Sequence, residues 1–268
     1  MAHRARKISI FSEILSGDAI IKIMFNKSQA FIWNGKEKQL KPVIRIPTQK
    51  IDELYGIEEQ KKLLIENTKA FIEGKRVNNV LLWGERGTGK TTLIKSLLNY
   101  FKDTPLRMIQ VLKSDIITIS YLYDIIYENP QFRCIIFIDD LSFNENEEEF
   151  RDLKLIMDGG LEEFPENSVI YATSNRRTLM PAVSQSDNEL FPEDTLQERA
   201  SLIERFGLRI GFYRFSEEQY LEIVKHYASK NGISLSQNEL IKKAHEWALV
   251  HGTTGRSAYQ FVLSLQIP

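Results

Sequence analysis

This chain contains few cysteines and histidines, and its positive and negative charges nearly balance. One cysteine among 268 residues, Cys134, excludes an internal disulfide. The four histidines show no paired spacing of metal ligands. Lysine and arginine total 35 against 36 for aspartate and glutamate, so the net charge of -1 gives no overall attraction to nucleic acid. Any polyanion site must therefore be local, and a reducing, cytoplasmic setting is expected.

Long apolar runs are also missing. The run Cys134–Ile138 is far shorter than the roughly 20 residues that cross a membrane. The basic amino-terminal start is followed by an apolar segment that Glu13 and Asp18 interrupt. We therefore expect neither a signal peptide nor a membrane anchor.

Three regions divide the chain, whose 43% hydrophobic residues are enough for one large core and a small second unit. Residues 1–48 contain two β-like runs, Ala19–Phe25 and Gln29–Trp33, and predict a strand-rich arm or linker. Residues 49–215 alternate helical and strand-like segments, and residues 216–268 are helical in pattern. This order predicts an α/β domain followed by a small α-helical lid.

Five short apolar runs in the middle region are typical of buried parallel strands. Segments long enough for crossover helices separate them, so we expect a parallel five-stranded sheet with helices on both faces. The predicted strands are Val80–Trp83, Met108–Leu112, Cys134–Ile138, Val169–Thr173 and Leu208–Phe212.

A glycine-rich segment follows the first predicted strand. Residues 84–91 fit the pattern G-x-x-x-x-G-K-[ST] and precede the helical segment Thr92–Tyr100. The backbone N–H groups of such a loop point inward around a β-phosphate, and the following helix adds its positive end. Lys90 would reach the β- and γ-phosphates, and Thr91 would coordinate Mg²⁺. The predicted phosphate-binding residues are Gly84, Glu85, Arg86, Gly87, Thr88, Gly89, Lys90, Thr91 and Thr92.

Two later strands are predicted to run into polar residues. Asp139 and Asp140 terminate one of them, and Asn175 comes soon after the other. In α/β sheets the carboxyl ends of the strands are where ligands bind. Asp139 is the natural Mg²⁺ partner, either directly or through a ligand of the ion, and Asp140 is the group that orients an attacking water. The Asn175 amide would hydrogen-bond the γ-phosphate or that water.

The ensemble of motifs resembles that of AAA+ ATPases, over a stretch from about Leu54 to Arg256. Within that class the motif sequences are similar to an uncharacterised bacterial family of predicted ATPases. The Asp-Asp pair also resembles that of replication initiators and helicase loaders. The motifs, in the AAA+ order, are the phosphate loop, Asp139-Asp140, Thr173-Ser174-Asn175, Glu204-Arg205-Phe206 and Gly255-Arg256.

This resemblance implies roles for single residues. Asn175 would be sensor 1, and Arg256 would be sensor 2, acting from the lid of the same chain. Arg205 would be an arginine finger supplied to a neighbouring subunit, which implies a homo-oligomer. Arg199 and Arg209 lie near the same position, and only the Phe-Gly that follows Arg205 favours it.

The segment before the first helix of the α/β domain completes the implied site. The segment Leu54-Tyr55-Gly56-Ile57 is similar to the one that lines the adenine pocket of AAA+ proteins, and Tyr55, Gly56 and Ile57 are its predicted nucleotide-binding residues. ATP and Mg²⁺ are therefore the implied cofactors.

The expected function is hydrolysis of ATP with Mg²⁺ at a subunit interface, in order to remodel or load a macromolecular partner. The alternative is a nucleotide-gated, DNA-associated loader or recruiter with little turnover. A small-molecule kinase would leave Asn175 and the Gly255-Arg256 lid motif unexplained. We expect a protein partner ahead of DNA, since the basic pair Arg176-Arg177 has no aromatic interleaving in the sequence.

Overall fold

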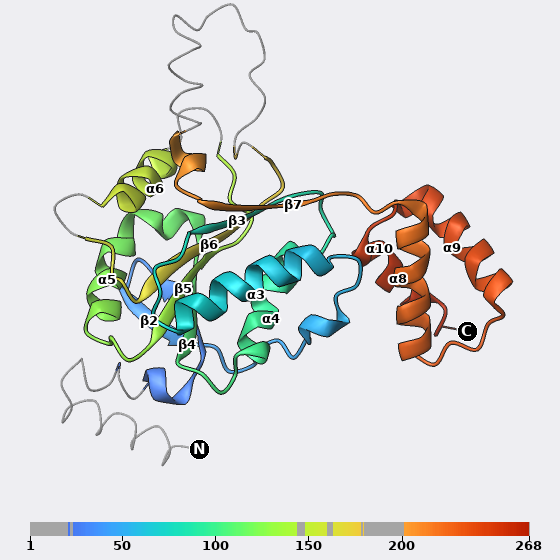
Figure 1. Cartoon of the computed structure of the whole chain (residues 1–268), viewed down its shortest axis with the longest axis horizontal. Helices are drawn as coiled ribbons and strands as arrows, with labels where there is room; N and C mark the ends of the chain where they lie inside the picture. Colours follow the sequence, from blue (N-terminus) through green and yellow to red (C-terminus); the bar gives the residue numbers. More distant parts are fainter. Residues whose placement is uncertain are drawn as a thin grey trace, which may run out of the picture.

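A seven-stranded sheet in the order β2-β1-β4-β5-β6-β3-β7 lies at the centre of the computed structural model (Figure 1). The structure describes residues 21, 24–143, 148–159, 163–177, 179 and 201–267. Neighbouring strands are parallel except β1 and β2. The strands are β1 (Ala30–Asn34), β2 (Gln39–Pro42), β3 (Val80–Gly84), β4 (Leu106–Val111), β5 (Arg133–Ile138), β6 (Ser168–Ser174) and β7 (Leu208–Phe212).

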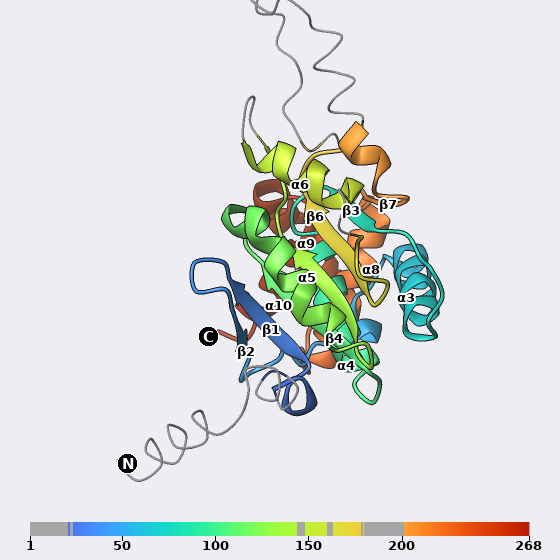
Figure 2. The same cartoon turned by 90° about the vertical axis from the view of Figure 1, so that its left-hand side faces the viewer.

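The five predicted strands correspond to β3–β7, which are adjacent in the sheet, so the predicted parallel α/β class is confirmed. Helices α3 and α4 cover one face and α5 and α6 the other (Figure 2). Side chains alternate between the two cores along β5, where Phe137 belongs to one core and Ile138 to the other. The helices of this domain are η1 (Ile51–Glu53), α3 (Glu58–Ile72), α4 (Lys90–Tyr100), η2 (Lys113–Thr118), α5 (Ile119–Tyr127) and α6 (Glu148–Asp158).

The amino-terminal region belongs to this sheet. β1 pairs in parallel with β4, and β2 folds back on β1 through a turn that begins at Asn34-Gly35. The sheet therefore crosses the predicted boundary at residue 48, and residues 30–42 are two of its strands rather than a separate arm. The division of the whole chain into three domains stays a prediction.

One predicted strand is replaced by a helical turn. Residues 24–27 are helical, and the Ser28 N–H donates to the Met24 carbonyl at 3.0 Å. The Phe25 ring is fully buried against Phe31, with the ring centroids 5.0 Å apart. A short apolar run fits a buried helix as well as a strand, so the strand predicted for Ala19–Phe25 is wrong at its described residues, 21, 24 and 25. Residues 19, 20, 22 and 23 of that run lie outside the described residues.

A small helical lid follows the sheet and forms a separate lobe in Figure 1. It consists of α8 (Glu217–Lys230), α9 (Gln237–His251) and α10 (Gly255–Ser264). A side-chain oxygen caps each amino terminus: Ser216, Ser236 and Thr254 accept hydrogen bonds from backbone N–H groups three residues further on. These caps explain why the predicted helices begin where they do.

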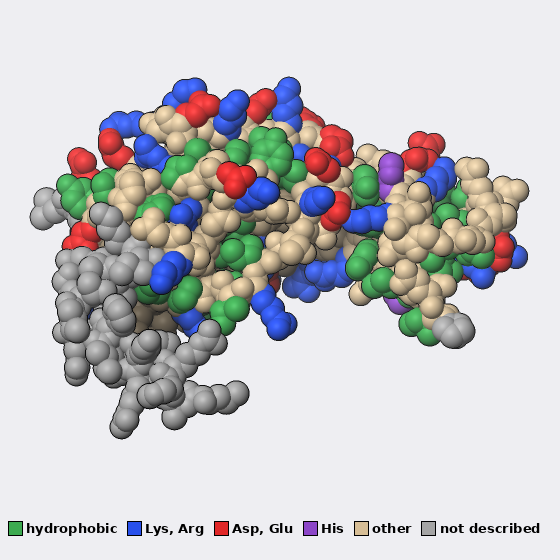
Figure 3. Space-filling view, turned by 90° about the horizontal axis from the view of Figure 1, so that it is seen from below, with side chains coloured by type: hydrophobic (Ala, Val, Ile, Leu, Met, Phe, Trp, Pro, Cys, Tyr) green, Lys and Arg blue, Asp and Glu red, His purple; other side chains and the backbone are tan. Residues whose placement is uncertain are grey.

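Acidic and basic side chains are intermingled over the face of the molecule in Figure 3, in keeping with the balanced charge of the sequence. Among the described residues, the structure contains no helix with both the length and the apolar character to span a membrane.

Candidate functional site

Glycine is required where the predicted phosphate loop leaves β3. Gly84 has a φ of 128°, and a Cβ there would lie 1.9 Å from the carbonyl oxygen of Phe212 in β7. Gly89 has a φ of 101° and is the N-cap of α4. Both angles strongly disfavour any other residue. The loop therefore curls tightly between the end of a strand and the start of a helix, as the sequence pattern predicts.

The Lys90 amine lies inside the curl of this loop. Its Nζ donates hydrogen bonds to the carbonyl oxygens of Gly84 and Glu85, at 2.8 and 2.7 Å, and to Oδ1 of Asn175 at 3.2 Å. Only 6% of Lys90 is exposed. Burial lowers the pKa of this amine to about 8, although the carboxylate of Asp140 opposes the shift. A buried, positively charged group inside a curled backbone loop is suited to binding a multiply charged anion.

Asp139 receives two hydroxyl groups on one oxygen. Oγ1 of Thr91 and Oγ1 of Thr173 donate to its Oδ1 at 2.7 and 2.6 Å, and Nζ of Lys95 lies 3.9 Å from its Oδ2. A hydroxyl and a carboxylate are the hard oxygen ligands that Mg²⁺ prefers. The predicted metal residues Thr91 and Asp139 are thus in contact, and their chemistry fits Mg²⁺. Sequence reasoning gave Thr173 no role, although a threonine at the end of an apolar strand is a usable signal.

In the part of the chain that the structure describes, no cluster of three or more His, Cys, Asp or Glu side chains could hold a metal on its own. A magnesium ion at Thr91 and Asp139 would therefore need ligands from a phosphate or from water. Such sparse coordination by protein is usual for Mg²⁺ at nucleotide phosphates.

Asp140 and Asn175 meet beside the Lys90 amine. Nδ2 of Asn175 donates to Oδ1 of Asp140 at 2.5 Å, while its own Oδ1 accepts from Lys90. The Asp140 backbone has a φ of 52°, which is uncommon outside glycine, and its N–H is fixed by Oγ1 of Thr173 at 2.9 Å. Three predicted site residues from separate strands and a helix thus form one connected network.

This network borders a cavity of about 410 Å³ at the carboxyl edge of the sheet. The cavity brings together residues of four separate sequence motifs, for which phosphate-binding, metal-binding and catalytic roles are predicted. Its lining residues are Arg86, Gly87, Gly89, Lys90, Thr91, Thr92, Asp139, Asp140, Thr173, Asn175 and Arg256.

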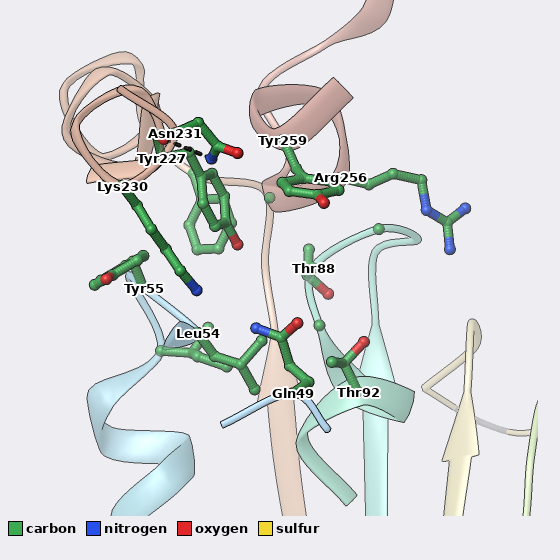
Figure 4. A pocket seen from close by; sticks show the side chains of 15 residues that line it. Gln49, Leu54, Tyr55, Thr88, Thr92, Tyr227, Lys230, Asn231, Arg256 and Tyr259 are labelled. Carbon is green, nitrogen blue, oxygen red and sulfur yellow. Dashed lines mark hydrogen bonds between the residues drawn. The ribbon is translucent and has the colours of Figure 1, made fainter. Parts of the chain in front are cut away.

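A second cavity of about 340 Å³ lies on the other side of the phosphate loop, between the sheet and the lid (Figure 4). Tyr55 and Ile57 line it, as predicted, whereas Gly56 has a φ of 78° and packs toward Phe215 and Ile223. This cavity adjoins the phosphate loop and has the size of a nucleoside.

Much of this second cavity comes from residues that sequence reasoning missed. Lys230 reaches toward its centre from α8, and burial raises the pKa of the nearby Tyr227 to about 12. These residues lie more than 150 positions beyond Tyr55 and match no motif, so the sequence offers no local signal for them. The missed lining residues are Gln49, Phe215, Tyr227, Lys230, Asn231 and Tyr259.

Arg256 lies at the junction of the two cavities. Its backbone N–H donates to the Gly87 carbonyl at 3.0 Å, and its side chain extends away from Tyr227 (Figure 4). Gly87 has a φ of 76°, and a Cβ there would lie 3.2 Å from the Cβ of Arg256. The lid thus contacts the phosphate loop through Arg256, in the place expected for a sensor in the same chain.

Arg205 lies elsewhere. It precedes β7, so it sits at the amino edge of the parallel strands, while the phosphate loop is at the carboxyl edge. Its guanidinium pairs with the Asp158 carboxylate and donates to the Ser201 carbonyl. Arg209, the nearby alternative, is exposed on β7, and Arg199 lies outside the described residues. The structure therefore does not bring Arg205 to the phosphate loop of its own chain.

The sheet order, the phosphate loop and the lid together define a P-loop protein with the AAA+ fold. More narrowly, the model of the family described as "Protein of unknown function (DUF815)" matches residues 26–267, and the chain belongs to that family. The resemblance to an uncharacterised AAA+ family is confirmed. No curated protein sequence matches the chain.

Solved structures support the fold. The chain is similar to the Thermotoga maritima RuvB Holliday junction branch migration motor, with a TM-score of 0.55 and 20% identity over 81% of this chain. It is similar to the FIGL-1 AAA domain in complex with ADP, with a TM-score of 0.53 and 19% identity, covering 81% of this chain and 72% of that one. This chain spans 64% of the RuvB chain. At such identities the likeness concerns the fold.

Proposed function

We propose that this protein binds ATP with Mg²⁺ and hydrolyses it at a site completed by a neighbouring subunit, to drive a change in a macromolecular partner. One observation carries the proposal: Lys90, Asp139, Asp140 and Asn175 converge on one cavity at the carboxyl edge of the sheet. The adjoining cavity under the lid has room for the nucleoside. The ADP in the FIGL-1 structure, which shares the fold, agrees with this ligand class.

Each residue of the network has a chemical task in this proposal. Lys90 neutralises phosphate charge, and Thr91 with Asp139 would hold Mg²⁺, which when bound offsets further phosphate charge. Asp140 accepts a proton from the attacking water. Asn175, which bonds both Lys90 and Asp140, orients that water and responds to the γ-phosphate.

The first test separates binding from chemistry. Asp140→Asn keeps the shape of the side chain but removes its charge, so we expect ATP affinity to persist while turnover falls by about 10² or more. Calorimetry and a phosphate-release assay measure the two quantities. Turnover at the wild-type rate would remove Asp140 from the mechanism and leave Asn175 as the group that positions water.

The second test concerns assembly. Arg205 cannot serve its own phosphate loop from the opposite edge of the sheet, but it could serve the site of a neighbour once released from Asp158. Arg205→Ala should then abolish turnover with little loss of ATP affinity, because the arginine stabilises transition-state charge.

Mixing variants sharpens this test. A Lys90→Ala subunit is inactive but still donates its arginine, so mixing it with Arg205→Ala should restore partial turnover. Arg209→Ala is the matched control and should be active by itself. A mixture that stays inactive despite proven co-assembly would contradict the shared site, as would turnover by a monomer at any dilution.

A nucleotide-gated recruiter with little turnover is the second candidate, and the short side chain of Asp140 favours it. Many ATPases of this type have glutamate in that position, and aspartate is one methylene shorter. The rate of phosphate release by the unmodified protein separates the two candidates.

A further inference from the structure

A third cavity, of about 450 Å³, lies beside the phosphate loop at the ends of β3, β6 and β7. The roles assigned to the ATP site use Arg86 but neither the aromatic side chains of this cavity nor Arg176 and Arg177. We call it the aromatic–arginine cavity. Its lining residues are Trp83, Gly84, Glu85, Arg86, Asn175, Arg176, Arg177, Phe212 and Tyr213.

Two aromatic rings meet in this cavity, one on β3 and one directly after β7. The rings of Trp83 and Tyr213 are edge to face, with centroids 5.6 Å apart and planes at 85°. Trp83 is in register with Gly211 of β7, where a Cβ would lie 3.0 Å from Cζ2 of Trp83 and 3.0 Å from the hydroxyl oxygen of Tyr213. Tyr213 is nevertheless 66% exposed. A tyrosine ring that is braced by tryptophan and open to solvent offers a stacking face for a base.

Positive charge surrounds these rings. Arg176 and Arg177 are exposed, and the Arg177 guanidinium lies 5.2 Å from the centroid of the Trp83 ring. Arg86 lines the same cavity, where the one acidic lining residue, Glu85, is 3.7 Å from Arg214. Positive charge thus exceeds negative charge here, in a chain whose overall net charge is -1. Such a local excess attracts a polyanion.

We propose that the aromatic–arginine cavity binds single-stranded nucleic acid, with a base stacked on Tyr213 and the backbone phosphates held by Arg176 and Arg177. Stacking on an aromatic ring needs an unpaired base, which a duplex does not offer. An acidic protein would satisfy the arginines but leaves the exposed ring without a function. The inference names the partner of the proposed ATPase and in that respect rests on the proposed function.

The cavity is connected to the ATP site through Asn175. Asn175 lines both cavities and bonds Lys90 and Asp140, and Arg176 follows it directly. The Arg176 N–H is fixed by Oγ of Ser174 at 3.1 Å. Arg176, which would hold the nucleic acid, is therefore next in sequence to Asn175, the residue proposed to respond to the γ-phosphate. Binding of single-stranded nucleic acid should for that reason alter ATP turnover.

The test is fluorescence anisotropy of a labelled 20-nucleotide oligothymidine with the full-length protein. Tyr213→Ala should weaken binding about tenfold, whereas Tyr213→Phe, which keeps the ring, should bind as the unmodified protein does. Arg176→Glu and Arg177→Glu should each weaken binding and reduce its salt dependence. Arg45→Glu, an equal charge change after β2 and outside the cavity, should have no effect.

Several outcomes would overturn the inference. These are equal binding by Tyr213→Ala and Tyr213→Phe, equal binding of a duplex of the same length, and displacement of the strand by free nucleoside monophosphate at similar concentration. Loss of self-association in Arg176→Glu, with no strand bound by the unmodified protein, would make this face an interface between copies. Thermal melting of each variant verifies folding, and Tyr213→Leu, which keeps an apolar side chain but lacks the ring, tests the ring against Tyr213→Phe if the alanine variant unfolds.

ATP affinity is measured by calorimetry on the same proteins. Normal ATP binding and hydrolysis without strand binding would defeat this inference alone. Strand binding by a protein that neither binds nor hydrolyses ATP would defeat the proposed function instead.

Discussion

The two edges of the parallel sheet use polar side chains differently. At the carboxyl edge, the Asn175 side chain forms hydrogen bonds with the side chains of Lys90 and Asp140. At the amino edge, Asn167 is buried and its Nδ2 donates to the backbone carbonyls of Ile126, Asn129 and Phe132.

This difference separates binding from stability. The amide of Asn167 is buried and bonds backbone carbonyls of the fold itself, so its contacts serve stability and are not open to a ligand. The side chains at the carboxyl edge border a cavity and can trade their mutual bonds for bonds to phosphate. Arg205 belongs to the amino edge in this structure, and only a second subunit would give it a role at the other one.

Loss of the Lys90 amine should give the largest effect. Lys90→Ala removes the buried charge of the phosphate loop, so ATP affinity should fall about 10²-fold, since hydrogen bonds to charged groups contribute about 1.5–3 kcal/mol each. Calorimetry measures the affinity. Lys61→Ala is the control, because Lys61 is also buried but pairs with Glu58 on α3. Unchanged affinity in Lys90→Ala would refute the assignment of the phosphate loop.

A pair of asparagines tests the comparison directly. Asn167→Ala should lower the free energy of unfolding by about 2 kcal/mol, because buried carbonyls lose a donor, and should leave ATP turnover unchanged. Asn175→Ala should change stability by less than about 0.5 kcal/mol and reduce turnover. Urea denaturation and a phosphate-release assay measure both. The distinction between the edges fails if the two variants behave alike.

The pKa of Lys90 predicts a smaller, pH-dependent effect. With a pKa lowered to about 8, this amine is charged at pH 7 and mostly neutral at pH 9 in the free protein. Binding to phosphate favours the charged form, so ATP affinity should fall about tenfold from pH 7 to pH 9. Lys90→Arg stays charged over this range and should lose the pH dependence. A flat profile for the unmodified protein would contradict the lowered pKa.

Prediction from the sequence succeeded where the cause is local. The buried strands are short apolar runs, and the curl at Gly84 and Gly89 needs a backbone that only glycine adopts readily. The contact of Asn175 with Lys90 was also foreseeable, since strand ends in a parallel sheet share one edge. Prediction of a strand failed at the described residues of the run 19–25, namely 21, 24 and 25, because a short apolar run does not distinguish a strand from a buried helical turn.

By itself, the sequence determined the strands, the phosphate loop and the polar residues that end β5 and β6. The tertiary structure decided which distant residues join them: β1 and β2 at the sheet edge, Lys230 under the lid, and Tyr213 beside Trp83 and Arg177. Along the chain, no aromatic residues are interleaved with the basic pair Arg176-Arg177. In the folded protein, the rings of Trp83 and Tyr213 line the same cavity as this pair. Strand pairing places β3 between β6 and β7. Because this pairing depends on burial of the whole sheet, no short segment of the sequence predicts it.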